Sequence, residues 1–154
     1  MMYALRPRDM QKSGANVVFV DEKIFPQILA VMTTRAIPQG IQIRTGKYSE
    51  MEMTPDIFAC ILQYPNASGN VEDYRTFVEK AHAANCKVAV AADILSLALL
   101  TPPGEWGADI VFGTTQRLGT PMFYGGPSAG YFATRDEYKR NIPGRIIGLS
   151  LIHI

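Results

Sequence analysis

One segment says most about the architecture of this chain: Gly107-Ala108-Asp109-Ile110-Val111-Phe112-Gly113-Thr114-Thr115-Gln116-Arg117-Leu118-Gly119, followed by Thr120-Pro121-Met122-Phe123-Tyr124-Gly125-Gly126-Pro127. The apolar residues Ile110 to Phe112 predict a short buried strand. The polar residues behind them predict a turn, and the glycines predict a loop after that turn. A buried strand that ends in a polar turn is typical of α/β sheets, which bind ligands at the carboxyl ends of their strands.

Outward from this segment, strand and helix signals alternate along the chain. Proline near the start of a helical stripe and Asn85 as a left-handed terminator support two of the helices. Alternating strands and helices predict one α/β three-layer sandwich with a mostly parallel sheet and no internal domain boundary. We expect strands at 17–20, 41–44, 57–64, 87–92, 110–112 and 130–134, and helices at 25–36, from Asn70 to Asn85, and at 135–140.

Composition excludes several classes of protein. The chain has 154 residues, 47% of them hydrophobic and 19% charged, with a net charge of +1, which is ordinary for one soluble globular domain. It has no basic block for nucleic acid and no apolar run of about 18 residues for a membrane. The N-terminus lacks the apolar core of a signal peptide, so we expect a cytoplasmic protein. The spacing of Cys60 and Cys86 does not match a metal site, so we expect both to be reduced thiols in the core.

Short motifs for other chemistries are weak in this chain. Gly126-Pro127-Ser128-Ala129-Gly130 matches GxSxG, but a nucleophile elbow needs a helix after the serine, and strand-like residues follow here. We therefore interpret the motif as a tight turn. Neither GxGxxG after a strand nor a P-loop is present. His82 lies within a helical segment, and we expect it to be a surface histidine or a hydrogen-bonded one.

The segment around Arg117 resembles the strand and turn that carry the Schiff-base lysine in aspartate-aminotransferase-fold (type I) enzymes that use pyridoxal phosphate (PLP). Arg117 stands at the lysine position, and a guanidinium stays protonated, so it cannot attack an aldehyde. No lysine of the chain occupies a comparable position. A standalone aminotransferase-like enzyme is therefore disfavoured, unless its lysine lies outside this piece.

Two further residues follow strands at the edge where that fold holds its cofactor. Asn66 lies in the turn Tyr64-Pro65-Asn66-Ala67-Ser68-Gly69-Asn70, which is similar to turns near the cofactor in these enzymes. Asp93 follows the strand 87–92, near the place of the acid that pairs with the pyridine nitrogen. For Asn66 a turn with a helix cap, and for Asp93 a helix cap, are the simpler interpretations.

Long runs of the chain resemble the P-protein family of the glycine cleavage system, over essentially Met1 to Gly148. The most specific runs are 19–27, 91–95, 101–110, 113–117 and 131–140. The family has two homologous halves on the PLP-enzyme fold, and the resemblance is to the N-terminal half. The C-terminal half carries the PLP lysine, which accounts for Arg117. In some bacteria the halves are separate subunits.

The resemblance implies PLP-dependent decarboxylation of glycine, with transfer of the aminomethyl group to the lipoyl arm of a carrier (H) protein. The protein supplies orientation and electrostatics to the cofactor. The implied partners are the PLP-bearing half or subunit, the H protein and a second copy in a dimer, and the piece alone is expected to be inactive. A non-catalytic dimerisation scaffold is the alternative. The candidates for a vestigial or interface site are Asn66, Asp93, Thr115, Gln116, Arg117, Tyr124, Gly125 and Gly126.

The two ends of the chain lead to a separate expectation. Residues 1–148 are interpreted as part of a PLP-enzyme-like large domain that is truncated at both ends. Residues 149–154, Leu-Ser-Leu-Ile-His-Ile, match the translation of a common sequencing adaptor and are expected to be a non-native tail. His153 therefore enters no chemical argument.

Overall fold

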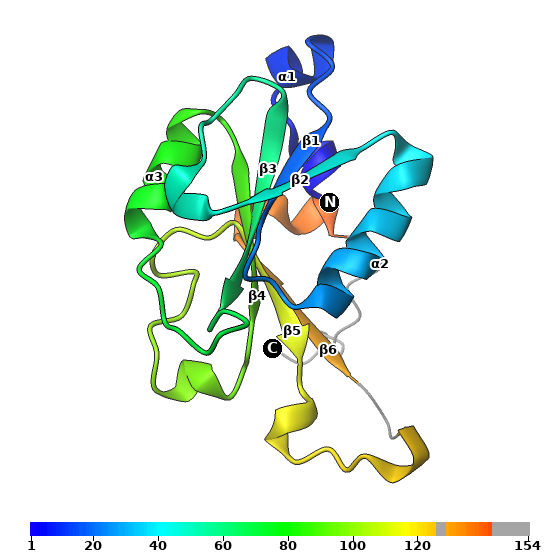
Figure 1. The fold of residues 1–154 in the computed structure, drawn as a ribbon, viewed down its shortest axis with the longest axis vertical. Coiled ribbons are helices and arrows are strands. Elements are labelled where there is room, and N and C mark those ends of the chain that lie inside the picture. Colours follow the sequence, from blue (N-terminus) through cyan, green and yellow to red (C-terminus); the bar gives the residue numbers. More distant parts are fainter. Residues whose placement is uncertain (126–128, 143–154) are drawn as a thin grey trace, which may run out of the picture.

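The computed structural model describes residues 1–125 and 129–142, which form one six-stranded sheet in the order β2-β1-β3-β4-β5-β6 (Figure 1). Neighbouring strands run parallel from β2 to β5, and β6 is antiparallel to β5. The predicted mostly parallel sheet is confirmed. The strands are β1 (Val17–Asp21), β2 (Gln42–Gly46), β3 (Ile57–Tyr64), β4 (Lys87–Ala92), β5 (Ile110–Thr114) and β6 (Gly130–Thr134).

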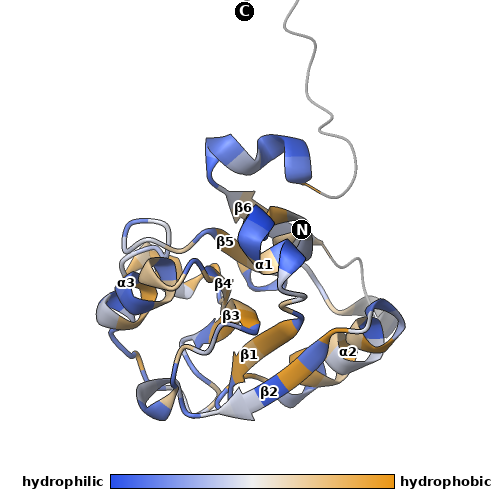
Figure 2. Cartoon of the chain, turned by 90° about the horizontal axis from the view of Figure 1, so that it is seen from above, coloured by the Kyte–Doolittle hydropathy of each residue, from blue (hydrophilic) through white to orange (hydrophobic). Residues whose placement is uncertain are grey.

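Helices lie on both faces of the sheet, as the three-layer prediction requires (Figures 1 and 2). The α-helices are α1 (Arg8–Lys12), α2 (Pro26–Ala36) and α3 (Arg75–Ala83). The 3-10 helices are η1 (Met2–Leu5), η2 (Ile37–Gln39), η3 (Tyr48–Glu50), η4 (Ser96–Ala98), η5 (Gln116–Leu118), η6 (Phe123–Gly125) and η7 (Asp136–Asn141). The predicted helix at 135–140 is thus a 3-10 helix.

Two hydrophobic cores flank the central strands, because side chains alternate between the faces of a strand. Phe19, Leu62 and Val90 belong to the core that includes Phe77 of α3. Val18 and Val20 belong to the core on the other face, against which side chains of α2 pack. Every residue of β3 is buried, which explains why its sequence is a nearly continuous apolar run.

The predicted start of the third helix is wrong. The helix was expected from Asn70, but α3 begins at Arg75. Asn70 closes a loop instead: its carbonyl accepts the Asn66 backbone N–H, and its own N–H donates to Asn66 Oδ1. At the true start, the Asp73 carboxylate accepts the Arg75 backbone N–H at 3.1 Å. The Asn85 terminator is confirmed by its φ of 60°.

Gly113, in β5 between its neighbours β4 and β6, has no room for a side chain. A Cβ on Gly113 would lie 2.2 Å from the Ala92 carbonyl oxygen and 2.7 Å from the Tyr131 ring. The Tyr131 hydroxyl donates to that same carbonyl at 2.8 Å. Only glycine allows this approach, which fixes the ends of the strands beside the candidate site.

Some expectations fall outside the described residues. These include Gly126, the Ser128 of the GxSxG match and the tail at 149–154. The chain is described again from Ala129, and Gly130–Thr134 form strand β6, not the helix that a nucleophile elbow needs. Within residues 1–125 and 129–142, no helix combines the length and the apolar character that crossing a membrane requires.

Candidate functional site

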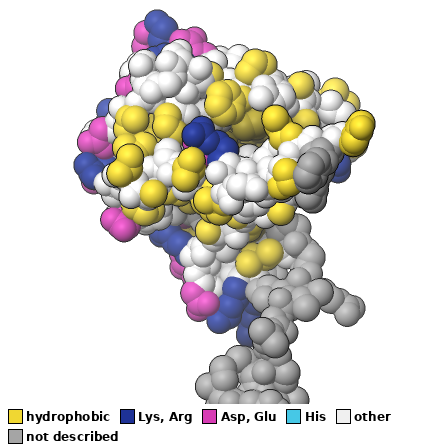
Figure 3. All heavy atoms as spheres, turned by 90° about the horizontal axis from the view of Figure 1, so that it is seen from below, with side chains coloured by type: hydrophobic (Ala, Val, Ile, Leu, Met, Phe, Trp, Pro, Cys, Tyr) yellow, Lys and Arg dark blue, Asp and Glu magenta, His cyan; other side chains and the backbone are white. Residues whose placement is uncertain are grey.

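A cavity of about 490 Å³ opens at the carboxyl ends of strands β3, β4 and β5. Six of the residues that define it are Phe25, Ile28, Gln63, Asp93, Phe112 and Arg117. Viewed from this end, hydrophobic side chains gather around a basic group (Figure 3). Its volume is within the range of small-molecule pockets, and its place in the sheet is the one where α/β proteins bind ligands.

An ion pair occupies the mouth of the cavity. Arg117, in η5 directly after β5, places a guanidinium nitrogen 3.0 Å from Asp93 Oδ2, at the end of β4. The Leu95 backbone N–H donates to Asp93 Oδ1 at 3.2 Å, so the turn after β4 fixes the carboxylate. The side chains are 62% and 23% exposed, respectively. The structure therefore brings together two of the predicted site residues, and their charges compensate each other.

Gln63 is a site residue that the sequence reasoning missed. It is 3% exposed, and its Oε1 accepts no hydrogen bond from any residue that the structure describes. Gln63 lines the cavity beside the ion pair, but this oxygen itself is buried beneath the cavity wall. The available signal was a polar amide inside the apolar run of β3.

The other predicted residues hold turns. Asn66 Oδ1 accepts the backbone N–H groups of Ser68 and Asn70, both at 3.0 Å, which matches the turn interpretation but not a helix cap. Thr115 donates through Oγ1 to the Ala129 carbonyl at 3.0 Å. Gln116 begins η5, where its backbone N–H donates to Thr114 Oγ1. None of these three lines the cavity.

The glycine-rich loop extends away from the sheet (Figure 1). Tyr124 is fully exposed at a φ of 39°, and Gly125 has a φ of 101°. The described part of this loop thus presents Tyr124 to solvent and does not line the cavity.

The residues of the cavity do not fit PLP as a covalently held cofactor. The position after β5 carries Arg117, and the carboxylate that would face a pyridine nitrogen is already paired with it. No lysine lines the cavity in the described part of the chain. Lys23 is 3.4 Å from Glu72, and Lys87 donates to the Tyr138 hydroxyl near the opposite end of the sheet.

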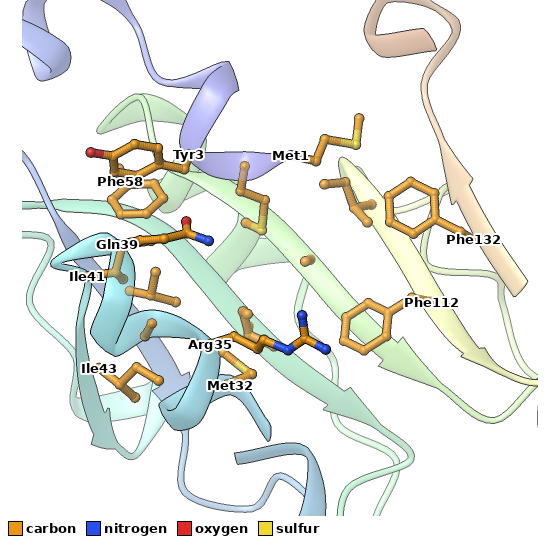
Figure 4. Close-up of a pocket in the computed structure, with 16 residues that line it drawn as sticks. Met1, Tyr3, Met32, Arg35, Gln39, Ile41, Ile43, Phe58, Phe112 and Phe132 are labelled. Atoms are coloured by element: carbon orange, nitrogen blue, oxygen red, sulfur yellow. The ribbon is translucent and has the colours of Figure 1, made fainter. Parts of the chain in front are cut away.

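A second cavity, of about 300 Å³, lies on the sheet face shared with α2 (Figure 4). Tyr3 and Phe58 lie on one side, and Phe112 and Phe132 lie on the other. The Arg35 side chain extends between them from α2. The walls of this second cavity are mostly apolar, and the cavity lies away from the carboxyl ends of the strands. It therefore offers hydrophobic contact but few groups that could take part in a reaction.

The remaining candidates for reactive chemistry are structural. Cys60 and Cys86 are both buried, and hydrogen bonding with Cys86, together with burial, raises the pKa of the Cys60 thiol. His82 Nε2 lies 2.9 Å from Oδ2 of the buried Asp109, as expected for a hydrogen-bonded histidine. In the described ranges, no three His, Cys, Asp or Glu side chains gather as a metal site requires.

Comparison with known proteins identifies the family. The family model described as "Glycine cleavage system P-protein" matches residues 3–152. The chain belongs to the glycine cleavage system P-protein family. A glycine dehydrogenase (decarboxylating) from Bacteroides thetaiotaomicron is 85% identical over 150 residues, which are 97% of this chain. This P-protein chain spans only 16% of that relative's length.

Solved structures agree with this assignment. A glycine decarboxylase (P-protein) in inhibitor-bound form is similar with a TM-score of 0.78 and 35% identity, over 89% of this chain and 32% of that one. A Campylobacter jejuni protein assigned as an O-acetylhomoserine (thiol)-lyase has a TM-score of 0.64 at 14% identity, over 79% of this chain and 31% of that one. It was solved with N'-pyridoxyl-lysine-5'-monophosphate. This P-protein segment therefore has the fold of PLP enzymes.

Proposed function

We propose that this chain is part of the N-terminal half of glycine decarboxylase, in which a second, PLP-bearing half performs the chemistry. The complete enzyme would decarboxylate glycine and transfer the aminomethyl group to the lipoyl arm of the H protein. The observation that carries the proposal is the Arg117–Asp93 pair, which stands where the fold would need a free lysine. The similarity to glycine decarboxylases supports the choice of reaction.

In this proposal the residues of the chain have supporting roles. Asp93 and Arg117 form a vestigial site, with Asn66, Thr115 and Gln116 holding the turns around it. The loop with Tyr124, Gly125 and Gly126 is a candidate contact for the catalytic half, for the H protein or for a second copy in a dimer. Because Tyr124 is fully exposed, it could contact a partner without rearranging the sheet. We expect the assembled enzyme in the bacterial cytoplasm.

Borohydride trapping tests where the covalent chemistry occurs. The complete enzyme is loaded with PLP, reduced with borohydride and mapped by peptide mass spectrometry. We expect one dominant pyridoxyl-lysine, on a peptide outside this chain. A pyridoxyl adduct on a lysine of this chain would overturn the proposal, because it would give this half a Schiff-base site of its own.

Exchange of Arg117 distinguishes a functional half from a mere scaffold. Arg117→Ala in the complete enzyme should lower the rate of CO₂ release from glycine while the assembly stays intact. Arg44→Ala is the matched control, because Arg44 pairs with Asp56 at 2.8 Å on the surface, away from the cavity. Equal rates for the two variants would favour the dimerisation scaffold.

A further inference from the structure

The second cavity, on the sheet face shared with α2, has no role in the proposed function. Its floor consists of side chains from β3, β4 and β5, among them Phe58, Ala89 and Ile110. Its two sides carry aromatic rings that remain exposed, Tyr3 at 39% and Phe132 at 43% (Figure 4). Exposed rings on either side of an apolar hollow are typical of a surface that another segment covers.

The architecture of the molecule favours a helix as this covering segment. In a three-layer α/β sandwich, helices cover the apolar side chains on both faces of the sheet. Helix α2 lines one side of the cavity through Met32, Arg35 and Ala36, and β6 lines the other side through Phe132. The floor between α2 and β6 is open, so a further helix packed beside α2 would complete the layer.

Arg35 indicates the charge that the covering segment carries. Its side chain extends from α2 between the two sides of the cavity (Figure 4). It forms no ion pair with any residue that the structure describes. A segment over the cavity would remove this guanidinium from water, which is costly unless an anionic partner replaces the water. The covering segment should therefore bring a carboxylate to Arg35.

The rest of the P-protein is the favoured source of such a helix. This chain spans only 16% of the Bacteroides thetaiotaomicron relative, and it covers 32% of the solved glycine decarboxylase chain. Most of the polypeptide in these proteins thus lies outside the region described here. A segment of the same polypeptide has a high effective concentration at the cavity, which favours it over a second copy or a separate partner.

We infer that an amphipathic helix of the complete P-protein, from outside residues 1–148, covers the second cavity. Its apolar side chains pack on Phe58, Ile110 and Phe132, and an Asp or Glu at the border of its apolar face pairs with Arg35. The inference rests on the family of the chain and not on the proposed decarboxylation. A pyridoxyl-lysine in this chain would therefore overturn the proposed function and leave this inference intact.

Photo-cross-linking of the complete P-protein tests the identity of the covering segment. Phe132 is replaced by p-benzoylphenylalanine, and the irradiated protein is separated by denaturing electrophoresis and mapped by peptide mass spectrometry. We expect a product with the mass of one polypeptide, cross-linked to a peptide outside residues 1–148 that contains Asp or Glu. The matched control carries the same photoprobe at Val71, which is 52% exposed and does not line the cavity.

Three outcomes of the cross-linking would overturn the inference. A product with the mass of two polypeptides would identify a second copy as the occupant. The absence of any cross-link beyond residues 1–148 would mean that no other segment covers the cavity. Capture of the same peptide from Phe132 and from Val71 would mean that the contact is not specific to the cavity.

Charge reversal tests the contact with Arg35. Arg35→Glu should lower the melting temperature of the complete protein, because it places two carboxylates together. Lys80→Glu is the matched control, since both residues are cations in the last turn of an α-helix, and Lys80 also forms no ion pair with the described residues. Exchange of the acidic residue of the captured peptide for lysine should restore the melting temperature of Arg35→Glu. Equal melting temperatures for Arg35→Glu and Lys80→Glu, or no such recovery, would refute the ion pair.

Discussion

At the scale of single residues, the ion-pair partner of Arg117 affects the chemistry at position 117 as much as the guanidinium itself does. Asp93 Oδ2 lies 3.0 Å from the guanidinium. A carboxylate this close also stabilises the protonated form of an amine, and a protonated amine is no nucleophile. We therefore predict that Arg117→Lys in the complete enzyme yields no additional pyridoxyl-lysine after borohydride trapping. The lysine trapped in the catalytic half is the internal positive control, and a second adduct at position 117 would contradict the prediction.

A second prediction concerns Asp21, whose charge should affect the stability of the fold. It is buried at the end of β1, with Oδ2 unpartnered among the described residues, and burial raises its pKa. A raised pKa means that this group stabilises the fold at low pH and that the contribution is lost as the pH rises through the folded-state pKa. Asp21→Asn should therefore raise the melting temperature of the complete protein at pH 8, with a smaller gain near pH 4, close to the pKa of 3.8 of an unperturbed aspartate.

Thermal melting at the two pH values measures this effect, with the exposed Asp136→Asn as the control. A lower melting temperature for Asp21→Asn at pH 8 would show that the charged carboxylate stabilises the fold instead.

At the scale of elements, the contact among β4, β5 and β6 depends on one missing side chain. A methyl group on Gly113 would overlap the Ala92 carbonyl and the Tyr131 ring. Gly113→Ala should destabilise the protein by about 3 kcal/mol, because backbone must move to accommodate it. Gly104→Ala is the control, since nothing lies within 4 Å of the methyl group there. Equal melting temperatures for the two variants would refute this account.

Elements with a strong apolar pattern were predictable from the sequence, and those set by local hydrogen bonds were less so. Strands β3 and β4 are buried on both faces, so their continuous apolar runs indicated central strands of a parallel sheet. The start of α3 was missed because Asn66 and Asn70 bond to each other. Arg117 and Asp93 were found through the family pattern. Gln63 was not found, because a polar residue in a strand reveals neither its burial nor its missing partner.

At the scale of the whole molecule, the described sheet has open boundaries. It ends in β2 and β6, and Phe132, Leu99 and Met122 are exposed. Unpaired strand edges and apolar surface favour association with other chains. We predict that residues 1–148 produced alone aggregate, and that co-production with the rest of the protein restores soluble material. Size-exclusion chromatography of both preparations checks this, and a monomer of 1–148 that unfolds cooperatively would contradict it.

The Arg117–Asp93 pair also has a consequence for how genes diverge. Lysine and arginine codons can differ by a single base, so one mutation can remove the nucleophile from a duplicated copy while keeping the positive charge beside Asp93. The reverse mutation restores an amine, but the amine meets a carboxylate that holds it protonated. The first step is thus easy and its reversal alone is ineffective. Such a copy is committed to a supporting role by its own ion pair.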